Sequence, residues 1–492
     1  MGQRGPISNL WKRMNEERPA GFCWCGDAVY GDRLEGVHRV PAKREELSSY
    51  YDLLLNSSTP YYPLEGAFHF GTIDDHDMGS NNAGEEWAGR FWAGELFDKF
   101  LMDSNAISGS PVVKNNSRGR RSMGVYGVEV FAFGKEGKKV EIFEEEISEA
   151  AGGEHKFPSK GRYTNDEEWQ KVAVFYLDCR TFKTEWYKGF DFFRTKGSTG
   201  DFLGAEQWSW FIAQLNSSDA DVNVIVNGLQ VLPSHRIPNG NLAEDWSKYP
   251  LARAKLYNAI LKSGARSPIL VSGDVHMSEI MRVDCVPPLS DENARARPIY
   301  EVTTSGITHS WGTFVSPQPD HRESWYFPYL SFLTGSLMYV AHYIMPWNEI
   351  LIDDNGVQQF NLDLNFATFK FDRLAGHHGG VLVNVNGPSG TVMSHFWTKS
   401  QLSGTDDSSL MKTSPSLSSL QQSARSDHDW SCYPHRGQPG YFRLISSFTA
   451  FGLIVVTAMV GPLVFVCTVC YALRNFLQKL LIKQIKCKVK IN

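Results

Sequence analysis

Short apolar runs that stop at polar residues are the main pattern in the first half of this 492-residue chain. Each run is rich in Val, Ile, Phe or Leu, which predicts buried β-strands. The runs are 22–25, 67–73, 172–177, 222–231 and 268–272. Apolar residues at helical spacing in 206–215 and 251–261 predict helices that cover a sheet face. The pattern therefore predicts a mixed α/β fold, and the runs 361–369 and 380–385 are expected to be its closing strands.

The residues that end these runs carry carboxylates, imidazoles and a guanidinium. They are Gly26-Asp27, Asp74-Asp75-His76-Asp77, Asp178-Cys179-Arg180, Ser234-His235-Arg236 and Gly273-Asp274-Val275-His276. In extended backbone, residues two apart point the same way, so Asp274 and His276 are aimed together. Because open α/β sheets bind ligands beyond the carboxyl ends of their strands, we expect these residues to converge on one site.

The densest of these clusters, residues 74–77, indicates a metal site. Three carboxylates within four residues repel one another, and a bound cation would hold them ionised. A solvated turn with helix-capping Asp residues is the alternative. Oxygen and imidazole ligands suit Ca, Mg, Mn or iron, with zinc possible, and so many acids suggest two metals. His76 is then placed to protonate a leaving oxygen, and Arg180 either holds phosphate or pairs with Asp178.

Four of the motifs, in their order along the chain and over about residues 1–400, resemble PhoD-like alkaline phosphatases, which belong to the calcineurin-like metallophosphoesterases. They are Gly26-Asp27 with Tyr30, Asp74-Asp75-His76-Asp77 with Asn81-Asn82, Asp178-Cys179-Arg180 and Gly273-Asp274-Val275-His276. The resemblance implies a two-sheet β-sandwich flanked by helices. It also implies an enzyme that uses iron with calcium and cleaves phosphate monoesters and diesters. It implies Asp27 and Tyr30 as ligands of one metal, the tyrosinate favouring ferric iron. Asp75, or else Asp74, matches the bridging or second-metal position, and His76 matches the catalytic histidine. The further ligands that it implies are Asn81 or Asn82, Asp274 and His276.

The chain departs from the family at its start. The family opens with a strand that ends in a Gly-Ser-Cys-like turn, whereas residues 1–6 are polar and 7–16 look helical. We expect either a late start, downstream of that strand and of a signal peptide, or a degenerate relative. Cys23 and Cys25 lie within an apolar run and are expected to be core residues rather than ligands.

The C-terminal part predicts a membrane anchor. Residues 444–473 carry no charge, which is enough to span a bilayer. The expected organisation is a catalytic domain at 1–399, a disordered Ser-rich stalk at 400–442, a transmembrane helix at 443–473 and a basic tail at 474–492.

The tail has six Lys or Arg residues and no acid, which predicts a single-pass protein with a cytoplasmic tail. The catalytic domain would then be lumenal or extracellular, and the sequons at Asn56, Asn115 and Asn216 fit that topology. A true tail anchor, which is the alternative, would leave the domain in the cytosol. The rest of the chain is acidic, which argues against nucleic-acid binding.

The leading hypothesis is a membrane-anchored, metal-dependent phosphoric ester hydrolase that acts on a small phosphate ester. The alternative is a catalytically inactive relative that serves as a binding or scaffold ectodomain. A serine hydrolase that uses Ser234 or Ser272 with His235 is disfavoured because no G-x-S-x-G motif is present.

Overall fold

The computed structural model describes the following residues: 10–35, 38–56, 62–110, 124–134, 140–144, 146–148, 154–157, 170–185, 199–234, 244–291, 294–308, 310–312, 327–372, 379–405, 426–437 and 439–489. Asn115, His235 and residues 406–425 of the expected stalk lie outside them. The chain divides into two compact units, one of residues 1–327 with 347–438 and one of residues 328–346 with 439–492.

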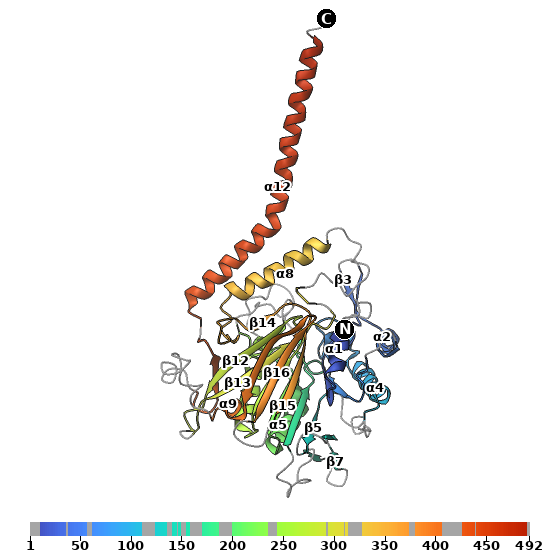
Figure 1. The fold of residues 1–492 in the computed structure, drawn as a ribbon, viewed down its shortest axis with the longest axis vertical. Helices are drawn as coiled ribbons and strands as arrows, with labels where there is room; N and C mark the ends of the chain where they lie inside the picture. Colours follow the sequence, from blue (N-terminus) through green and yellow to red (C-terminus); the bar gives the residue numbers. More distant parts are fainter. Residues whose placement is uncertain are drawn as a thin grey trace. The chain divides into compact units, whose positions relative to one another are not determined.

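A nine-stranded mixed sheet is the centre of the first unit (Figure 1). In sheet order its strands are β14 (Phe360–Asn361), β12 (Ser278–Val286), β13 (Arg297–Thr304), β11 (Pro268–Ser272), β10 (Val222–Asn227), β9 (Gln170–Leu177), β5 (Gly127–Phe133) and β6 (Val140–Glu144), and β18 (Ser431–Pro434) pairs with β12. The four central strands β13, β11, β10 and β9 are parallel. Their carboxyl ends therefore meet at one edge of the sheet, as the sequence pattern predicted.

A second β layer packs on one face of this sheet. It consists of the parallel pair β1 (Gly21–Cys25) and β4 (Phe68–Thr72) and the antiparallel sheet β15 (Phe366–Asp372), β16 (Gly380–Gly387) and β17 (Gly390–Thr398). Alternate residues of both layers, such as Val172, Val174, Val381 and Val383, share one buried core. This alternation is what a strand with one face toward a core requires.

Helices cover the outer faces of both layers. Phe211 of α5 (Gly204–Ser217) meets Phe175 of β9 on the far side of the large sheet, with ring centroids 5.9 Å apart. A second core joins α1 (Leu10–Glu16), α2 (Arg44–Asn56) and α4 (Arg90–Ser108) to β1, and α2 and α4 lie side by side (Figure 1).

The remaining elements of the first unit include four helices and two antiparallel strand pairs. They are α3 (Asp75–Met78), the 3-10 helix η6 (Trp246–Lys248), α6 (Pro250–Lys262), α9 (Lys399–Ser403) and the pairs β2 (Arg33–Glu35) with β3 (His38–Val40) and β7 (Glu146–Ser148) with β8 (Glu154–Lys156). The prediction of a mixed α/β fold with sheets flanked by helices is confirmed.

The expected stalk, residues 400–442, differs from the structure at both ends, and its first residues, 400–403, belong to α9. Residues 431–434, assigned to the stalk by their polar surroundings, form β18 and extend the large sheet. Cys432 forms a disulfide with Cys285 of β12. Composition alone missed this strand because β18 is only four residues long and gains its pairing from a partner far away in the sequence.

The second unit contains α8 (Phe327–Ile344) and the 49-residue helix α12 (Tyr441–Val489). Within α12, residues Tyr441–Ala458 are long and apolar enough to cross a membrane, with a mean hydropathy of 1.5. One such helix is weak evidence of a span, by length and composition only.

Candidate metal centre

The turn after β4 holds three buried acids with different surroundings. All five residues of β4 are buried, and the chain turns directly from it into α3. Asp77 accepts hydrogen bonds from the backbone of Val29 (3.1 Å), the backbone of Asp74 (3.1 Å) and the Tyr51 hydroxyl (3.2 Å). Its carboxylate therefore fixes the turn, while Asp74 and Asp75 face the strand ends.

Two further acids reach the same place from β1 and β11. Asp27, Asp274 and His276 all have positive φ, between 54° and 65°. Left-handed backbone in residues other than glycine is strained and concentrates at functional sites. Gly26 permits the close approach, because a Cβ at this position would lie 2.3 Å from the Cβ of Asp74.

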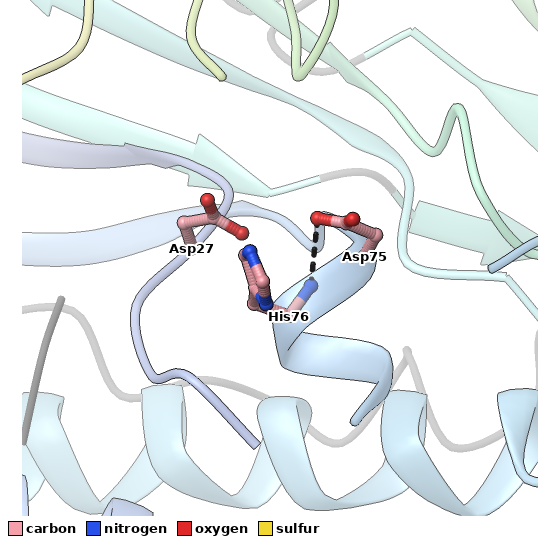
Figure 2. Close-up of side chains that lie close together, drawn as sticks. All are labelled: Asp27, Asp75 and His76. Atoms are coloured by element: carbon pink, nitrogen blue, oxygen red, sulfur yellow. Dashed lines mark hydrogen bonds between the residues drawn. The ribbon is translucent and has the colours of Figure 1, made fainter. Parts of the chain in front are cut away.

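The side chains form two overlapping clusters, each with its ligand atoms within 4.8 Å of one another. One contains Asp27, Asp75 and His76, drawn in Figure 2, and the other contains Asp27, Asp74, Asp75 and Asp274. Asp27 and Asp75 belong to both. Oδ2 of Asp74 is buried and has no hydrogen-bond partner among the described residues. A buried carboxylate oxygen without a donor is costly, so this donor set fits a cation.

Burial sets the electrostatics of these acids. It raises the pKa of Asp27 to about 6 and that of Asp74 to about 8, the latter against the charge of Arg180. It also raises the pKa of Asp274 well above its usual value, with help from the charge of Asp74. Burial also acts to raise the pKa of Asp75. The charges of His76 and Arg180 and two backbone hydrogen bonds act more strongly in the opposite direction, so the pKa of Asp75 is lowered.

His76 is oriented by a carboxylate. Its Nδ1 is hydrogen-bonded to Asp32, which is paired in turn with Arg39 at 2.6 Å. Burial lowers the pKa of His76, but the charges of Asp75 and Asp27 and the bond to Asp32 prevail and raise it to about 10. In Figure 2 the other ring nitrogen points toward Asp27. The imidazole is thus held in one orientation, with Nε2 toward the carboxylates.

The other predicted ligands lie around the clusters and outside the two close groups found among the described residues. The Tyr30 ring lies 4.1 Å from that of His76, and burial raises its pKa well above the usual value. The backbone N–H of Asn82 donates to Asp75 at 2.5 Å, and Asn81 donates to the side chain of Asn82. His276 lines the same cavity as Asp27 and Asp274.

The ion pair of Arg180 with Asp178, one of the two roles expected for Arg180, is replaced by ion pairs with other acids. Its guanidinium is fully buried and binds Asp74 and, at 2.5 Å, Glu244. Asp178 instead accepts the backbone N–H groups of Arg180 and Thr181, both at 2.9 Å, so it stabilises the turn. Arg180 therefore compensates the acidic cluster directly.

Sequence reasoning missed three residues that support the site. Asp32 orients His76, and Glu244 forms a second ion pair with Arg180 beside that of Asp74. Lys183 forms an ion pair with Glu244 at 3.2 Å. Gly31-Asp32 repeats the Gly26-Asp27 dipeptide, which was a usable signal for Asp32. The serine hydrolase alternative gains no support: Ser234 is hydrogen-bonded to Glu349, and Ser272 is buried against Thr303.

The fold and site define a candidate cation-binding centre at the strand ends of a two-layer α/β domain. Residues 163–324 match the family model described as PhoD-like phosphatase, a segment that includes Arg180, Asp274 and His276. This segment of the chain is therefore similar to PhoD-like phosphatases, which confirms the resemblance found in the motifs.

Comparison with solved structures gives a match to a structure titled "Structure of PhoD". The two are 14% identical with a TM-score of 0.40, and the match covers 80% of this chain and 70% of that chain. The comparison with curated proteins gives no match.

Proposed function

We propose that this protein is a metal-dependent phosphoric ester hydrolase that acts on small phosphate monoesters or diesters. The observation that carries the proposal is the group of four converging carboxylates, Asp27, Asp74, Asp75 and Asp274, with Arg180 as the cation bound directly to it. The match of residues 163–324 to PhoD-like phosphatases supports the same reaction class.

Two cations fit the ligand arrangement. Asp27 and Asp75 belong to both clusters, so they are the proposed shared ligands, and Asp74 and Asp274 complete the larger cluster. Tyr30, Asn81 or Asn82, and His276 are proposed as additional ligands. The chemistry that such cations supply is polarisation of a phosphoryl oxygen and activation of water. Iron with calcium is the pair that the resemblance implies, and Mn, Mg or Zn also suit these donors.

His76 is the proposed proton donor to the leaving oxygen. Asp32 holds its Nδ1, so Nε2 is the atom that can reach a substrate. Its raised pKa keeps the ring protonated at neutral pH, as a general acid requires. Arg180 is proposed as a positioning residue, because its buried guanidinium fixes Asp74 and lies 3.9 Å from Asp75.

The test is metal content by elemental mass spectrometry on the full chain in detergent, with hydrolysis of p-nitrophenyl phosphate and its bis ester. Stoichiometric metal with turnover supports the proposal. Metal without turnover would identify an inactive relative that binds rather than cleaves, and the absence of metal would refute the site. The matched control is Asp103→Asn, which removes an exposed acid on α4.

We further propose that α12 anchors the protein in a membrane, with the basic tail in the cytoplasm. The apolar stretch of α12 supports anchoring. The Cys285–Cys432 disulfide supports a lumenal or extracellular domain, since disulfides persist in oxidising compartments. Glycosidase treatment of protein from eukaryotic cells tests this topology. A mobility shift that disappears in Asn56→Gln/Asn115→Gln/Asn216→Gln is expected, and an unshifted, fully reduced protein would contradict it.

A further inference from the structure

The helix α8 exposes aromatic rings along one face. The side chains of Phe332, Tyr339 and Tyr343 are 60%, 38% and 71% exposed. An α-helix turns by about 100° per residue, so positions 339 and 343 lie within about 20° of position 332 around the helix axis. Ala341 and His342, which lie elsewhere around the axis, are buried. The three exposed rings are called the aromatic face of α8 below.

No charged residue accompanies these rings. Residues 324–348 contain no Asp, Glu, Lys or Arg, and α8 lies entirely within this stretch. A helix that faces water ordinarily carries charged residues on its outer face. Large exposed apolar groups without them mark a contact surface for a membrane or another protein. Tyrosine is enriched where membrane meets water, because its ring is apolar and its hydroxyl stays hydrated.

The connectivity of the large sheet decides how α8 can meet a membrane. The strands that precede and follow α8, β13 and β14, both pair with β12. A helix that crossed a bilayer between them would place β13 and β14 on opposite sides of it, which their common sheet excludes. The helix α8 can therefore only lie along a membrane surface. Among the described residues only α12 has the length and composition of a span.

Hydrogen bonds within the first unit join the segment that follows α8 to the segment that precedes α12. The backbone N–H of Arg436 donates to the carbonyl of Asn348 at 3.1 Å, and the side-chain amide of Asn348 donates to the carbonyl of Gly437 at 2.7 Å. The guanidinium of Arg436 donates to the carbonyl of Trp347 at 2.6 Å. Since α8 ends at residue 344 and α12 begins at residue 441, both helices join the first unit at one place.

We propose that α8 is an interfacial helix, whose aromatic face inserts into the headgroup region of the lipid bilayer that anchors α12. The proposal rests on the anchoring by α12 that is proposed above. A bilayer that holds the start of α12 lies only a few residues of chain away from the end of α8. Tyr343, the most exposed of the three rings, is in the last turn of α8 and so is nearest to that junction. The first unit would thus have a second membrane contact beside its anchor.

The chemistry of the aromatic face favours lipid over a second protein as its partner. Protein interfaces surround their apolar centre with a polar rim, and residues 324–348 supply no charge for one. The same lack of Lys and Arg defines the class of lipid. Basic helices bind anionic lipid and are released by salt, whereas α8 has no cation for either effect. Zwitterionic phosphatidylcholine is therefore a sufficient partner.

The test is photo-cross-linking of the full chain in phosphatidylcholine vesicles that contain a trace of biotinylated lipid. Benzoylphenylalanine replaces one residue at a time: Phe332 or Tyr343 on α8, Leu453 on α12, or Leu251 on α6. Phe332, Leu251 and Leu453 are 60%, 61% and 63% exposed, so their exposure is matched. Leu453 reports the anchor, and Leu251 reports chance contact. The readout is lipid attached to the protein, which does not depend on metal or catalysis.

We expect lipid transfer at positions 332 and 343 to exceed that at position 251 by about tenfold, because a ring inserted at the interface stays in contact with lipid. Transfer at 453 should be equally high. Addition of phosphatidylserine or of salt should leave transfer at 332 and 343 unchanged.

Charged substitutions provide a second measurement on the same face. Tyr339→Asp with Tyr343→Asp should lower transfer at position 332 by about tenfold, because insertion would bury two carboxylates. Transfer at position 453 should not change, since α12 keeps its anchor. The matched control is Ile352→Asp with Val357→Asp, at side chains of the first unit that are 43% and 57% exposed. This control should leave transfer at 332 intact.

The outcomes separate the proposal from the anchoring on which it rests. Transfer at 453 without transfer at 332 or 343 would overturn the proposal and leave the anchor standing. Transfer at 332 and 343 without transfer at 453 would support the contact of α8 and refute the anchor, and no transfer at any position would refute both. Cross-links from 332 or 343 to a second copy of the chain in place of lipid would make the aromatic face a protein interface. Transfer that requires phosphatidylserine would assign the contact to basic residues outside α8, and either result would overturn the proposal.

Discussion

Two groups of buried acids differ in whether the protein itself supplies their hydrogen-bond donors. On β12 and β13, Glu279 and Glu301 are fully buried, yet the protein supplies their donors. Glu301 accepts the backbone N–H groups of Val231 (2.8 Å) and Leu232 (2.7 Å), and Glu279 accepts the side-chain amide of Gln230 (2.7 Å). At the strand ends, Oδ2 of Asp74 has no such donor among the described residues, and four carboxylates crowd together.

The difference shows how a structural acid can be told from a ligand. Burial raises the pKa of Glu301 to about 7 and acts in the same direction on Asp27 and Asp74. A perturbed pKa alone therefore does not distinguish them. Their hydrogen-bond partners distinguish the two groups. A buried carboxylate that accepts hydrogen bonds from the protein needs no cation, whereas a buried carboxylate oxygen without a donor is stabilised by one.

Removal of a shared ligand should have the largest effect. Asp75→Asn is expected to lose bound metal and to lower kcat/KM by about 10³-fold, the scale of losing a charge-stabilising group in an active site. Metal content and p-nitrophenyl phosphate hydrolysis measure it, with Asp103→Asn as control. Full metal occupancy and activity in Asp75→Asn would place the site elsewhere.

Glu301 is expected to affect the pH dependence of stability rather than the catalytic activity. The pKa of Glu301 is raised in the fold, so the native state holds this proton at pH values where the unfolded chain has released it. The contribution of Glu301 is therefore fully present below pH 4.5 and is lost as pH rises to about 7, on the order of 3 kcal/mol.

Glu301→Gln should flatten this part of the pH dependence and leave metal content unchanged. Urea unfolding at pH 5 and pH 8 measures the difference in the free energy of unfolding. An unchanged slope in the variant would show that Glu301 does not titrate in this window.

The residue that orients His76 should have a smaller effect than a ligand. Asp32→Asn is expected to lower kcat by about 10–100-fold with metal retained, the range for a carboxylate that supports an active-site histidine. Without the charge of Asp32 the pKa of His76 falls, so the alkaline limb of the kcat profile should move to lower pH. Loss of metal instead, with no shift of that limb, would make Asp32 part of the ligand support rather than a partner of a proton donor.

The smallest expected effect is a change in amide exchange when the metal is removed, and it should differ between the two groups of acids. Chelation should speed amide exchange in the turns 26–30, 74–82 and 273–277, where carboxylates lose their cation. The amides of Val231 and Leu232, which Glu301 holds, should not change. Hydrogen exchange with and without chelator measures both, and equal changes at the two places would mean that the cation supports the whole sheet.

The strand ends and the acids at them could be predicted from the sequence, because short apolar runs and their abrupt termination are local signals. Asp27, Asp74, Asp75 and Asp274 come together as expected. The partner of Arg180 could not be predicted in this way. Asp178 is two residues away, but its carboxylate is used by the turn, and the guanidinium reaches Asp74 instead.

Long-range pairing explains the other differences. Glu244 lies in a polar segment with no motif, and its role exists only because the fold brings it to Arg180. The pairing of Cys432 with Cys285 links residues 147 positions apart, and composition around Cys432 indicated only a polar stalk.

If α12 anchors the protein as proposed, the same disulfide affects how the first unit could be released from the membrane. Residues 406–425 are rich in Ser and connect α9 to β18 along the sequence, so a protease cut among them would divide the chain between these two elements. A single cut there would not release the sandwich from α12, because Cys285 and Cys432 keep the two fragments joined covalently. Release would require both cleavage and reduction, or a cut in the short connection between β18 and α12.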